Sequence, residues 1–219
     1  GLCEAPIEVH FHGTAGQSFG VWNAGGLHMY LWGDANDYVG KGMSGGSIAI
    51  APHSDAPIVA KRSAIIGNTC LYGATGGKLF AAGSAGERFG VRNSGVHAVV
   101  EGSGDHCCEY MTGGVVVVLG STGRNVGAGM TGGVTFLLDE EGRVAPRVNP
   151  EIVEVCTITT HEQESLLKGL LERHVALTGS EKAAALLADW SAAKGRFKVL
   201  VPPSEREAMG LADKQAVAA

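Results

Sequence analysis

Two glycine motifs in this sequence match the pattern of a dinucleotide-binding loop. GKGMSG begins at Gly40 and GAGMTG begins at Gly127, and both satisfy G-x-G-x-x-G. In a dinucleotide-binding domain, that loop follows a strand and opens a helix whose N-terminus meets the pyrophosphate. Here each copy leads into a strand-like run, SIAIA or VTFLL. The context indicates turn glycines, so we expect no nucleotide site.

Histidines and cysteines offer the other candidates for chemistry. His10 and His12 would share one face of a strand, but two histidines without an evident third ligand are a weak metal signal. Cys3 is not the first residue, and no glycine-rich setting surrounds it as a nucleophile. Vicinal Cys107 and Cys108 could be redox-active, although neighbours in a strand point to opposite faces and buried cysteine commonly fills cores. We predict no catalytic, cofactor-binding or metal-binding residue in this chain.

The elements that would have to position such residues form a repeat. A glycine followed by a short apolar strand recurs as NAGGLHMYLWG, GMSGGSIAIAP, GATGGKLFAAG, RNSGVHAVVEG, YMTGGVVVVLG and GMTGGVTFLLD. The leading glycines are separated by 20, 31, 19, 18 and 19 residues. A polar, proline-containing insertion from His53 to Ser63 explains the long step. We predict that the leading glycines are structural turn residues: Gly25, Gly45, Gly76, Gly95, Gly113 and Gly132.

A unit of about 19 residues with a single short strand cannot bury its apolar face alone, so the units must stack. Glycine suits the corners, where the backbone turns with positive φ or passes close to the next coil. A calcium-binding β-roll is excluded because apolar residues, rather than Asp, follow the glycine pairs. We predict a mainly β protein, a right-handed parallel β-helix of about six to seven single-stranded coils with a C-terminal helical tail.

The glycine distribution divides the chain into two parts, a glycine-rich β-helix over residues 1–150 and a tail over residues 151–219. Of the 34 glycines, 30 lie in the first part. In the tail, Thr160 and Gln163 form a capping box that predicts a helix ending at Gly179, and Ser180 can cap a second helix. FKVLV from Phe197 predicts a short strand. We expect this tail to cover an end or a flank of the solenoid, or to face another domain.

The run from Val115 to Leu119 is apolar at every position, so both of its faces must be covered. With a period of two, Val115, Val117 and Leu119 share one face, and Val116 and Val118 share the other. Strands of this kind occur in sheets that are buried on both sides. One of the two sets should therefore contact either another molecule or the leucines on one face of the tail helix, Leu167, Leu170 and Leu171.

Composition excludes several classes of protein. The formal charge of −5 and the 18% charged residues suggest neither a nucleic-acid partner nor an anionic membrane surface. No apolar run approaches the roughly 18 residues of a membrane-spanning helix. The five cysteines lack a C-x-x-C spacing, which favours a reducing compartment. The first residues have no initiator Met and no signal-peptide features, so we expect a fragment located in the cytoplasm.

The GMSGG and GMTGG repeats, together with TGS at residues 178–180, Trp190 and FKVLVPPSE, closely resemble one known domain. It is the C-terminal GXGXG β-helix domain of the glutamate synthase large subunit, and the resemblance covers essentially the whole chain. It implies a non-catalytic domain of an oxidoreductase that forms glutamate from glutamine and 2-oxoglutarate. The parent enzyme would contain a glutaminase domain and a synthase domain with FMN and a [3Fe-4S] cluster, none of which this chain would bind.

The resemblance also implies the partners and the location. The partners would be the other domains of the large subunit, with no nucleic acid and no membrane, and a second copy could bind through exposed apolar faces. The location would be the cytoplasm, or the plastid stroma in a photosynthetic eukaryote, and the electron donor would be ferredoxin or NADPH. Two alternatives stay open: a free-standing scaffold that binds a flavoprotein or a formylmethanofuran-dehydrogenase-like partner, and a small-molecule-binding enzyme.

Overall fold

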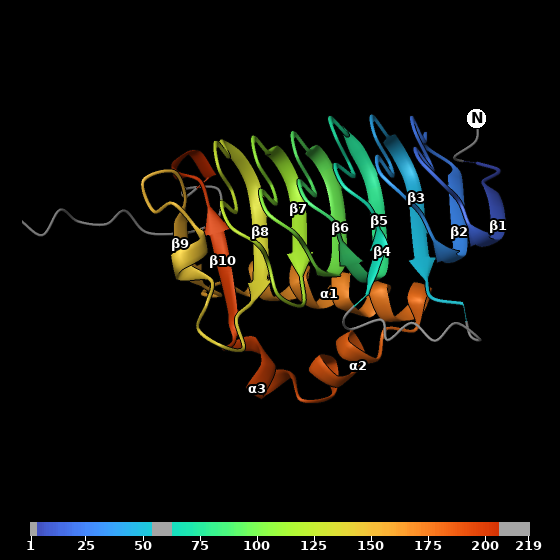
Figure 1. Cartoon of the computed structure of the whole chain (residues 1–219). Coiled ribbons are helices and arrows are strands. Elements are labelled where there is room, and N and C mark those ends of the chain that lie inside the picture. The colour runs from blue at the N-terminus through green and yellow to red at the C-terminus, as the bar shows by residue number, and fades with distance from the viewer. Residues whose placement is uncertain (1–3, 54–62, 206–219) are drawn as a thin grey trace, which may run out of the picture.

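Stacked parallel strands form the body of the molecule in the computed structural model, which describes residues 4–53 and 63–205. The strands make one sheet in the order β1-β2-β3-β5-β6-β7-β8-β10-β9, with the short β4 beside β5 (Figure 1). This is the predicted β-solenoid, with about six turns. The strands of the stack are β1 (Ile7–Thr14), β2 (Leu27–Asp34), β3 (Ser44–Ala51), β4 (Ala64–Ile66), β5 (Gly76–Ala85), β6 (Ser94–Gly102), β7 (Thr112–Val118) and β8 (Gly132–Leu138).

Turns with an unusual backbone connect the coils. In one of them, Arg88, Gly90 and Arg92 all have left-handed φ angles, of 58°, 71° and 53°. The amides of these three residues point alternately toward the two neighbouring coils. The Arg88 amide donates to the carbonyl of Asp105 in the next coil at 2.8 Å, and the Gly90 amide donates to Cys70 in the preceding coil at 3.0 Å. Backbone hydrogen bonds therefore hold the turns together as they hold the strands.

The register of the strands separates two apolar layers. Val116 lies opposite Ala98, and Val117 lies opposite Val99. Val116 and Val118 belong to the solenoid interior. The outward set belongs to a second cluster that includes the tail leucines: Val115, Val117, Leu119, Leu167, Leu170 and Leu171. The expectation that one face of this strand contacts the tail is thus confirmed, and the solenoid has a core both inside and outside its wall.

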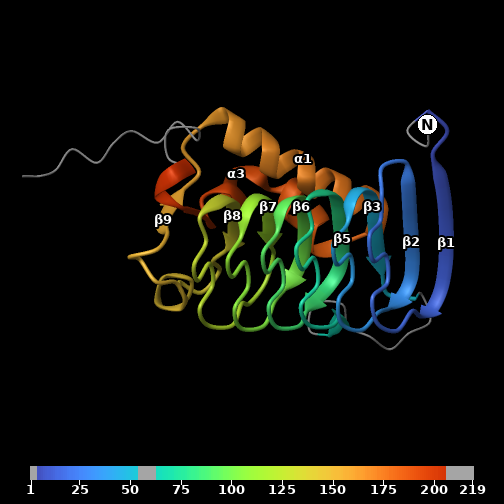
Figure 2. The same cartoon turned by 90° about the horizontal axis from the view of Figure 1, so that it is seen from above.

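The tail helices lie along one flank of the stack. The first helix, α1 (His161–Thr178), starts at the Thr160–Gln163 capping box and stops at left-handed Gly179, as predicted. Ser180 caps α2 (Glu181–Ala188), and α3 (Trp190–Lys194) follows. Figure 2 shows α1 running beside β8 to β3, while β1 and β2 extend beyond it. None of these helices is long and apolar enough to cross a membrane, as judged over the described residues.

Tail strands cover one end of the solenoid. The strand β10 (Phe197–Val201) pairs antiparallel with β8 and with β9 (Glu154–Thr157), so Val199 lies opposite Phe136. Two short 3₁₀ helices, Ala145–Arg147 and Pro203–Glu205, flank this cap. The tail therefore covers both a flank and an end of the solenoid, because its helices lie along the flank and its strands pair at the end. Most of the predicted insertion, residues 54–62, lies outside the described residues.

Candidate functional site

The two G-x-G-x-x-G motifs lie in turns of the solenoid. Gly40 and Gly42 have φ angles of 63° and 65°, and the chain then enters β3 rather than a helix. Their amides already donate to neighbouring coils: Gly40 to the Phe19 carbonyl and Gly42 to the Tyr72 carbonyl, both at 2.9 Å. Gly127 likewise donates to the preceding coil. Amides used in this way cannot cradle a phosphate, since each has a single proton to donate.

The leading glycines of the repeat lie at or just inside the strands. Gly113 is the second residue of β7, where the pairing with β6 shifts register. A Cβ on Gly113 would lie 2.4 Å from the Ser94 carbonyl oxygen, and Gly114 has a φ of 82°. Crowding by the adjacent coil thus disfavours a side chain at Gly113. At Gly114 the positive φ adds to the same crowding, since a Cβ there would lie 2.5 Å from the Val96 carbonyl oxygen. The same crowding by backbone atoms, at 2.1 to 2.8 Å, applies to Gly45, Gly76, Gly95 and Gly132, whereas Gly25 lies in the turn before β2.

The two histidines share the exposed outer face of β1, as their spacing predicts. His10 stacks on Tyr30 with ring centroids 4.8 Å apart, and His12 stacks on Trp32 at 5.2 Å. Across residues 4–53 and 63–205, no three His, Cys, Asp or Glu side chains converge closely enough to hold a metal ion. The histidines thus form part of an aromatic stack. The described residues provide no set of metal ligands around them.

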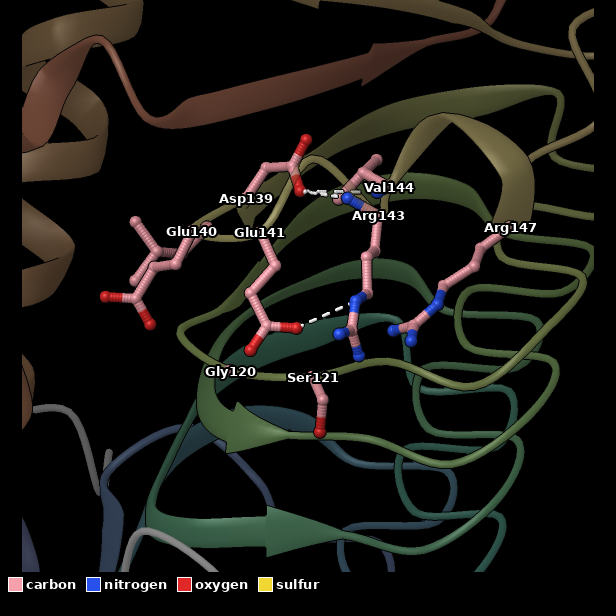
Figure 3. A pocket seen from close by; sticks show the side chains of 9 residues that line it. Gly120, Ser121, Asp139, Glu140, Glu141, Arg143, Val144 and Arg147 are labelled. Atoms are coloured by element: carbon pink, nitrogen blue, oxygen red, sulfur yellow. Dashed lines mark hydrogen bonds and ion pairs between the residues drawn. The ribbon is translucent and has the colours of Figure 1, made fainter.

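A small pocket lies beside the loop that follows β8 (Figure 3). Its volume is about 80 Å³, far below the several hundred Å³ of a typical small-molecule site. Its charged groups are occupied by one another, because Asp139 accepts from the Arg143 amide at 2.7 Å and Glu141 pairs with the Arg143 side chain at 2.9 Å. Arg147 donates to the Thr122 carbonyl. This pocket neither fits a flavin nor offers a free charge to a substrate.

A buried polar cluster, which we term the Glu101 joint, connects the solenoid to the tail. It consists of Glu101 from β6, His174 from α1 and Ser180 at the start of α2. The Glu101 and His174 side chains are 2% and 0% exposed, and their Oε1 and Nε2 atoms lie 3.6 Å apart. The Ser180 hydroxyl donates to the same carboxylate oxygen. The sequence pattern identified Ser180 only as a helix cap and did not single out Glu101 or His174, because the three residues lie in distant segments.

The chemistry of the Glu101 joint is structural. Burial alone would raise the pKa of Glu101, but the contacts from His174 and Ser180 outweigh burial and hold that pKa below its ordinary value. Serine, histidine and glutamate also occur together in hydrolase triads. Here, however, the Ser180 hydroxyl donates to Glu101 instead of to His174, and all three side chains are shut off from solvent. The arrangement stabilises a carboxylate and does not activate a nucleophile.

Comparison with known proteins places this geometry in a family. The model of the GXGXG motif family matches residues 1–203. The chain belongs to the GXGXG family. Pairs of left-handed glycines two residues apart recur in its turns, as at Gly40 and Gly42 or at Gly127 and Gly129.

Several relatives of this GXGXG chain are named as ferredoxin-dependent glutamate synthases. The chain is 58% identical over 93% of its length to ferredoxin-dependent glutamate synthase 2 of Synechocystis sp.. It is 57% identical over 91% of its length to the Pyropia yezoensis protein, and 55% identical over 92% to the first Arabidopsis thaliana protein. The chain spans only 12 to 13% of the length of these relatives. It therefore corresponds to one segment of much longer proteins.

The cysteines of the GXGXG chain are core residues, but their placement differs from the prediction. Cys107 and Cys108 lie in a turn rather than a strand, so they do not point to opposite faces. Their sulfur atoms are 3.7 Å apart, and both are fully buried in the interior. The contact with Cys107, and then burial, raises the pKa of Cys108. Burial raises the pKa of Cys70 to about 12.

These thiols do not fit an iron–sulfur cluster or a reactive site. Metal ligation and nucleophilic attack both require a thiolate that the metal or substrate can reach. The raised pKa values disfavour the thiolate at Cys70 and Cys108. The hydrogen bond with Cys108 lowers the pKa of Cys107, but the Cys107 side chain is fully buried. We expect Cys70, Cys107 and Cys108 to resist alkylation by iodoacetamide in the native protein and to react only in urea. Peptide mapping after labelling would measure this. Blocking the half-buried Cys156 first removes the background from the tail. Rapid native labelling of any of the three buried cysteines would contradict the placement.

Proposed function

We propose that this chain is the non-catalytic structural domain of a glutamate synthase. In the whole enzyme it would hold the glutaminase domain and the FMN synthase domain in register while glutamine and 2-oxoglutarate become glutamate. The observation that carries the proposal is the identity of more than half of the residues, over about nine-tenths of the chain, to proteins named as glutamate synthases. The short span relative to those proteins favours a domain over a free-standing scaffold.

The construction of the molecule suits a holding role. The solenoid has an interior core that includes Ile48 and Val116, and a second core joins its outer wall to the tail helices. Two cores that share one sheet resist bending of the wall, because any bend must open contacts on one side of it. The Glu101 joint adds a buried polar contact between the same two layers. A body built in this way can keep attached domains at a constant distance.

The donor, the cofactors and the location follow from the relatives and from the resemblance. We infer that ferredoxin, rather than NADPH, supplies electrons to the parent enzyme, since the relatives are named as ferredoxin-dependent. FMN and the [3Fe-4S] cluster would be bound by other domains. A relative from Spinacia oleracea is named as chloroplastic, and one from Arabidopsis thaliana as chloroplastic/mitochondrial. The location would thus be the plastid stroma in such an organism, and the cytoplasm in a bacterium.

The proposal predicts that the purified chain is inactive by itself. We expect it to carry no flavin absorbance, to release no ammonia from glutamine above background and to form no glutamate from 2-oxoglutarate. The reason is that its glycine-turn amides are engaged and the pocket beside the loop after β8 is small. Absorbance spectroscopy and a coupled ammonia assay would measure these properties. A stoichiometric yellow chromophore would favour the small-molecule enzyme instead.

The holding role has its own test in the whole enzyme. Deletion of the segment equivalent to this chain should separate the two half-reactions, so that glutamine is hydrolysed without a matching yield of glutamate. The measured quantity is the ratio of glutamate formed to glutamine consumed. A variant with only residues 206–219 removed controls for shortening of the chain. An unchanged ratio after deletion of the whole segment would contradict the proposal.

A further inference from the structure

A row of aromatic and basic side chains, four of them exposed and two half-buried, follows the turns of successive coils. We term it the turn ridge, and it consists of Trp22, Tyr38, Lys41, Tyr72, Arg92 and Tyr110. Trp22 is 75% exposed and Tyr110 is 56% exposed. Single exposed apolar residues are normal on a protein surface, but a row of large ones marks an interaction site. Tryptophan, tyrosine and arginine are also the residues that dominate binding energy at interfaces.

The members of the turn ridge are in contact with one another. The Lys41 ammonium lies 5.3 Å from the centre of the Tyr38 ring and 5.9 Å from that of Tyr72. The Arg92 guanidinium lies 6.0 Å from the Tyr72 ring, and its Nη1 donates to the Tyr72 hydroxyl at 3.5 Å. Arg92 and Tyr110 then line one shallow groove. These contacts make the ridge a continuous surface across several coils.

Glycines of the turns hold two of the aromatic rings in place. A Cβ on Gly42 would lie 2.7 Å from the Trp22 ring, and a Cβ on Gly129 would lie 2.4 Å from the Tyr110 ring. Each ring therefore rests directly on the backbone of the next coil. An aromatic side chain held before binding loses little conformational entropy when a partner arrives. Gly42 and Gly129 thus shape the outer surface as well as the turn.

The charges of the turn ridge indicate the chemistry of its partner. Lys41 and Arg92 contact aromatic rings, and neither pairs with a carboxylate in the part of the chain that the structure describes. A nearby arginine of the same wall behaves differently, since Arg88 pairs with Glu109 at 3.1 Å. Lys41 and Arg92 are therefore two cations that have no carboxylate partner among the described residues and that lie beside aromatic rings. Such a surface is complementary to one that carries Asp or Glu.

We propose that the turn ridge docks onto an acidic surface of another domain of the same longer protein. This inference rests on the proposed function and adds the surface through which it operates. The chain spans about an eighth of the length of its relatives, so most of the polypeptide that could supply the acidic surface lies outside it. A second copy fits less well, because a two-fold contact through the ridge would bring Lys41 and Arg92 of both copies together.

Photo-cross-linking in the whole protein tests this docking. A benzophenone amino acid is placed at Trp22, at Tyr110 or, as a control on the helical flank, at exposed Glu172. After irradiation, mass spectrometry identifies the captured peptides. We expect Trp22 and Tyr110 to capture acidic peptides from outside these 219 residues, and Glu172 to capture different ones. Capture of a second copy, capture of a separate protein, or no capture at all would overturn the proposal.

A charge reversal tests the complementarity. In the whole protein, Lys41→Glu with Arg92→Glu should lower the yield of the Trp22 cross-link about tenfold, because like charges then meet. The matched control is Lys168→Glu with Arg173→Glu on the exposed side of α1, which should leave the yield unchanged. Equal yields for the two pairs would contradict the proposal. Thermal midpoints equal to that of the wild type would show that both pairs still fold.

The outcomes separate this inference from the proposed function. If deletion of the chain uncouples the half-reactions but the turn ridge captures nothing, the holding role stands and the docking surface lies elsewhere. If the ridge captures an acidic peptide while deletion leaves coupling unchanged, the docking stands and the holding role fails.

Discussion

Removal of the Glu101 carboxylate should be among the most damaging single changes to this protein. Glu101→Ala removes the carboxylate that both the fully buried His174 imidazole and the Ser180 hydroxyl contact. A buried polar group left without its partner typically costs about 1 to 3 kcal/mol. We expect a decrease of that size in the free energy of unfolding, measured by urea denaturation with circular dichroism.

Two controls test whether the loss of stability comes from the burial of Glu101 and from the unpaired groups that its removal leaves. Glu172→Ala, on the exposed side of α1, should change the free energy of unfolding by no more than about 0.5 kcal/mol. A double variant, Glu101→Leu with His174→Leu, should lose less than the sum of the single variants, because it leaves no unpaired buried group. If Glu101→Ala unfolds at the same urea concentration as Glu172→Ala, the Glu101 joint does not stabilise the tail.

Replacement of the Glu101 carboxylate by an amide, in Glu101→Gln, should weaken the loss of stability that occurs in acid. The pKa of Glu101 is lower in the folded protein than its ordinary value of 4.5. The carboxylate therefore contributes its stability above the unfolded-state pKa and loses it as the pH falls through the folded-state pKa. The difference between the wild type and Glu101→Gln should be largest near neutral pH and should shrink in acid.

A methyl group on Gly113 should disrupt the stacking of the coils. In Gly113→Ala the new Cβ would lie 2.4 Å from the Ser94 carbonyl oxygen, which belongs to the backbone of the adjacent coil and cannot swing away. We expect a loss of about 1 to 3 kcal/mol, and more for Gly113→Val. Urea midpoints of the purified variants would measure this loss.

A matched glycine exists within α1. Gly169 has no atom within 4 Å of a built Cβ, and alanine is favoured over glycine inside helices by up to about 1 kcal/mol. Gly169→Ala should therefore stabilise the protein slightly while Gly113→Ala destabilises it. Shifts of the same sign and size would contradict the crowding at Gly113. The tail glycine Gly210 would be a weaker control, because it lies outside the described residues.

Local patterns account for what could be predicted from the sequence. The period of about 19 residues required stacking, because no single unit could bury its strand. The Thr160–Gln163 capping box and Gly179 determined both ends of α1, since capping involves only neighbours three or four residues apart. The alternation from Val115 to Leu119 correctly predicted two covered faces, because side chains of any strand alternate.

Tertiary structure decided the features that join distant segments. Glu101 and Ser180 are 79 residues apart in the chain, and only the packing of α1 on the solenoid wall brings them together. The expectation that Cys107 and Cys108 would face opposite sides failed because the left-handed turn, which no local propensity favours for cysteine, replaced a strand there. The sequence by itself thus determined the stacking, the caps and the alternation. The joint, the turn ridge and the pairing of β10 with β8 depend on which coils become neighbours, a property of the assembled stack.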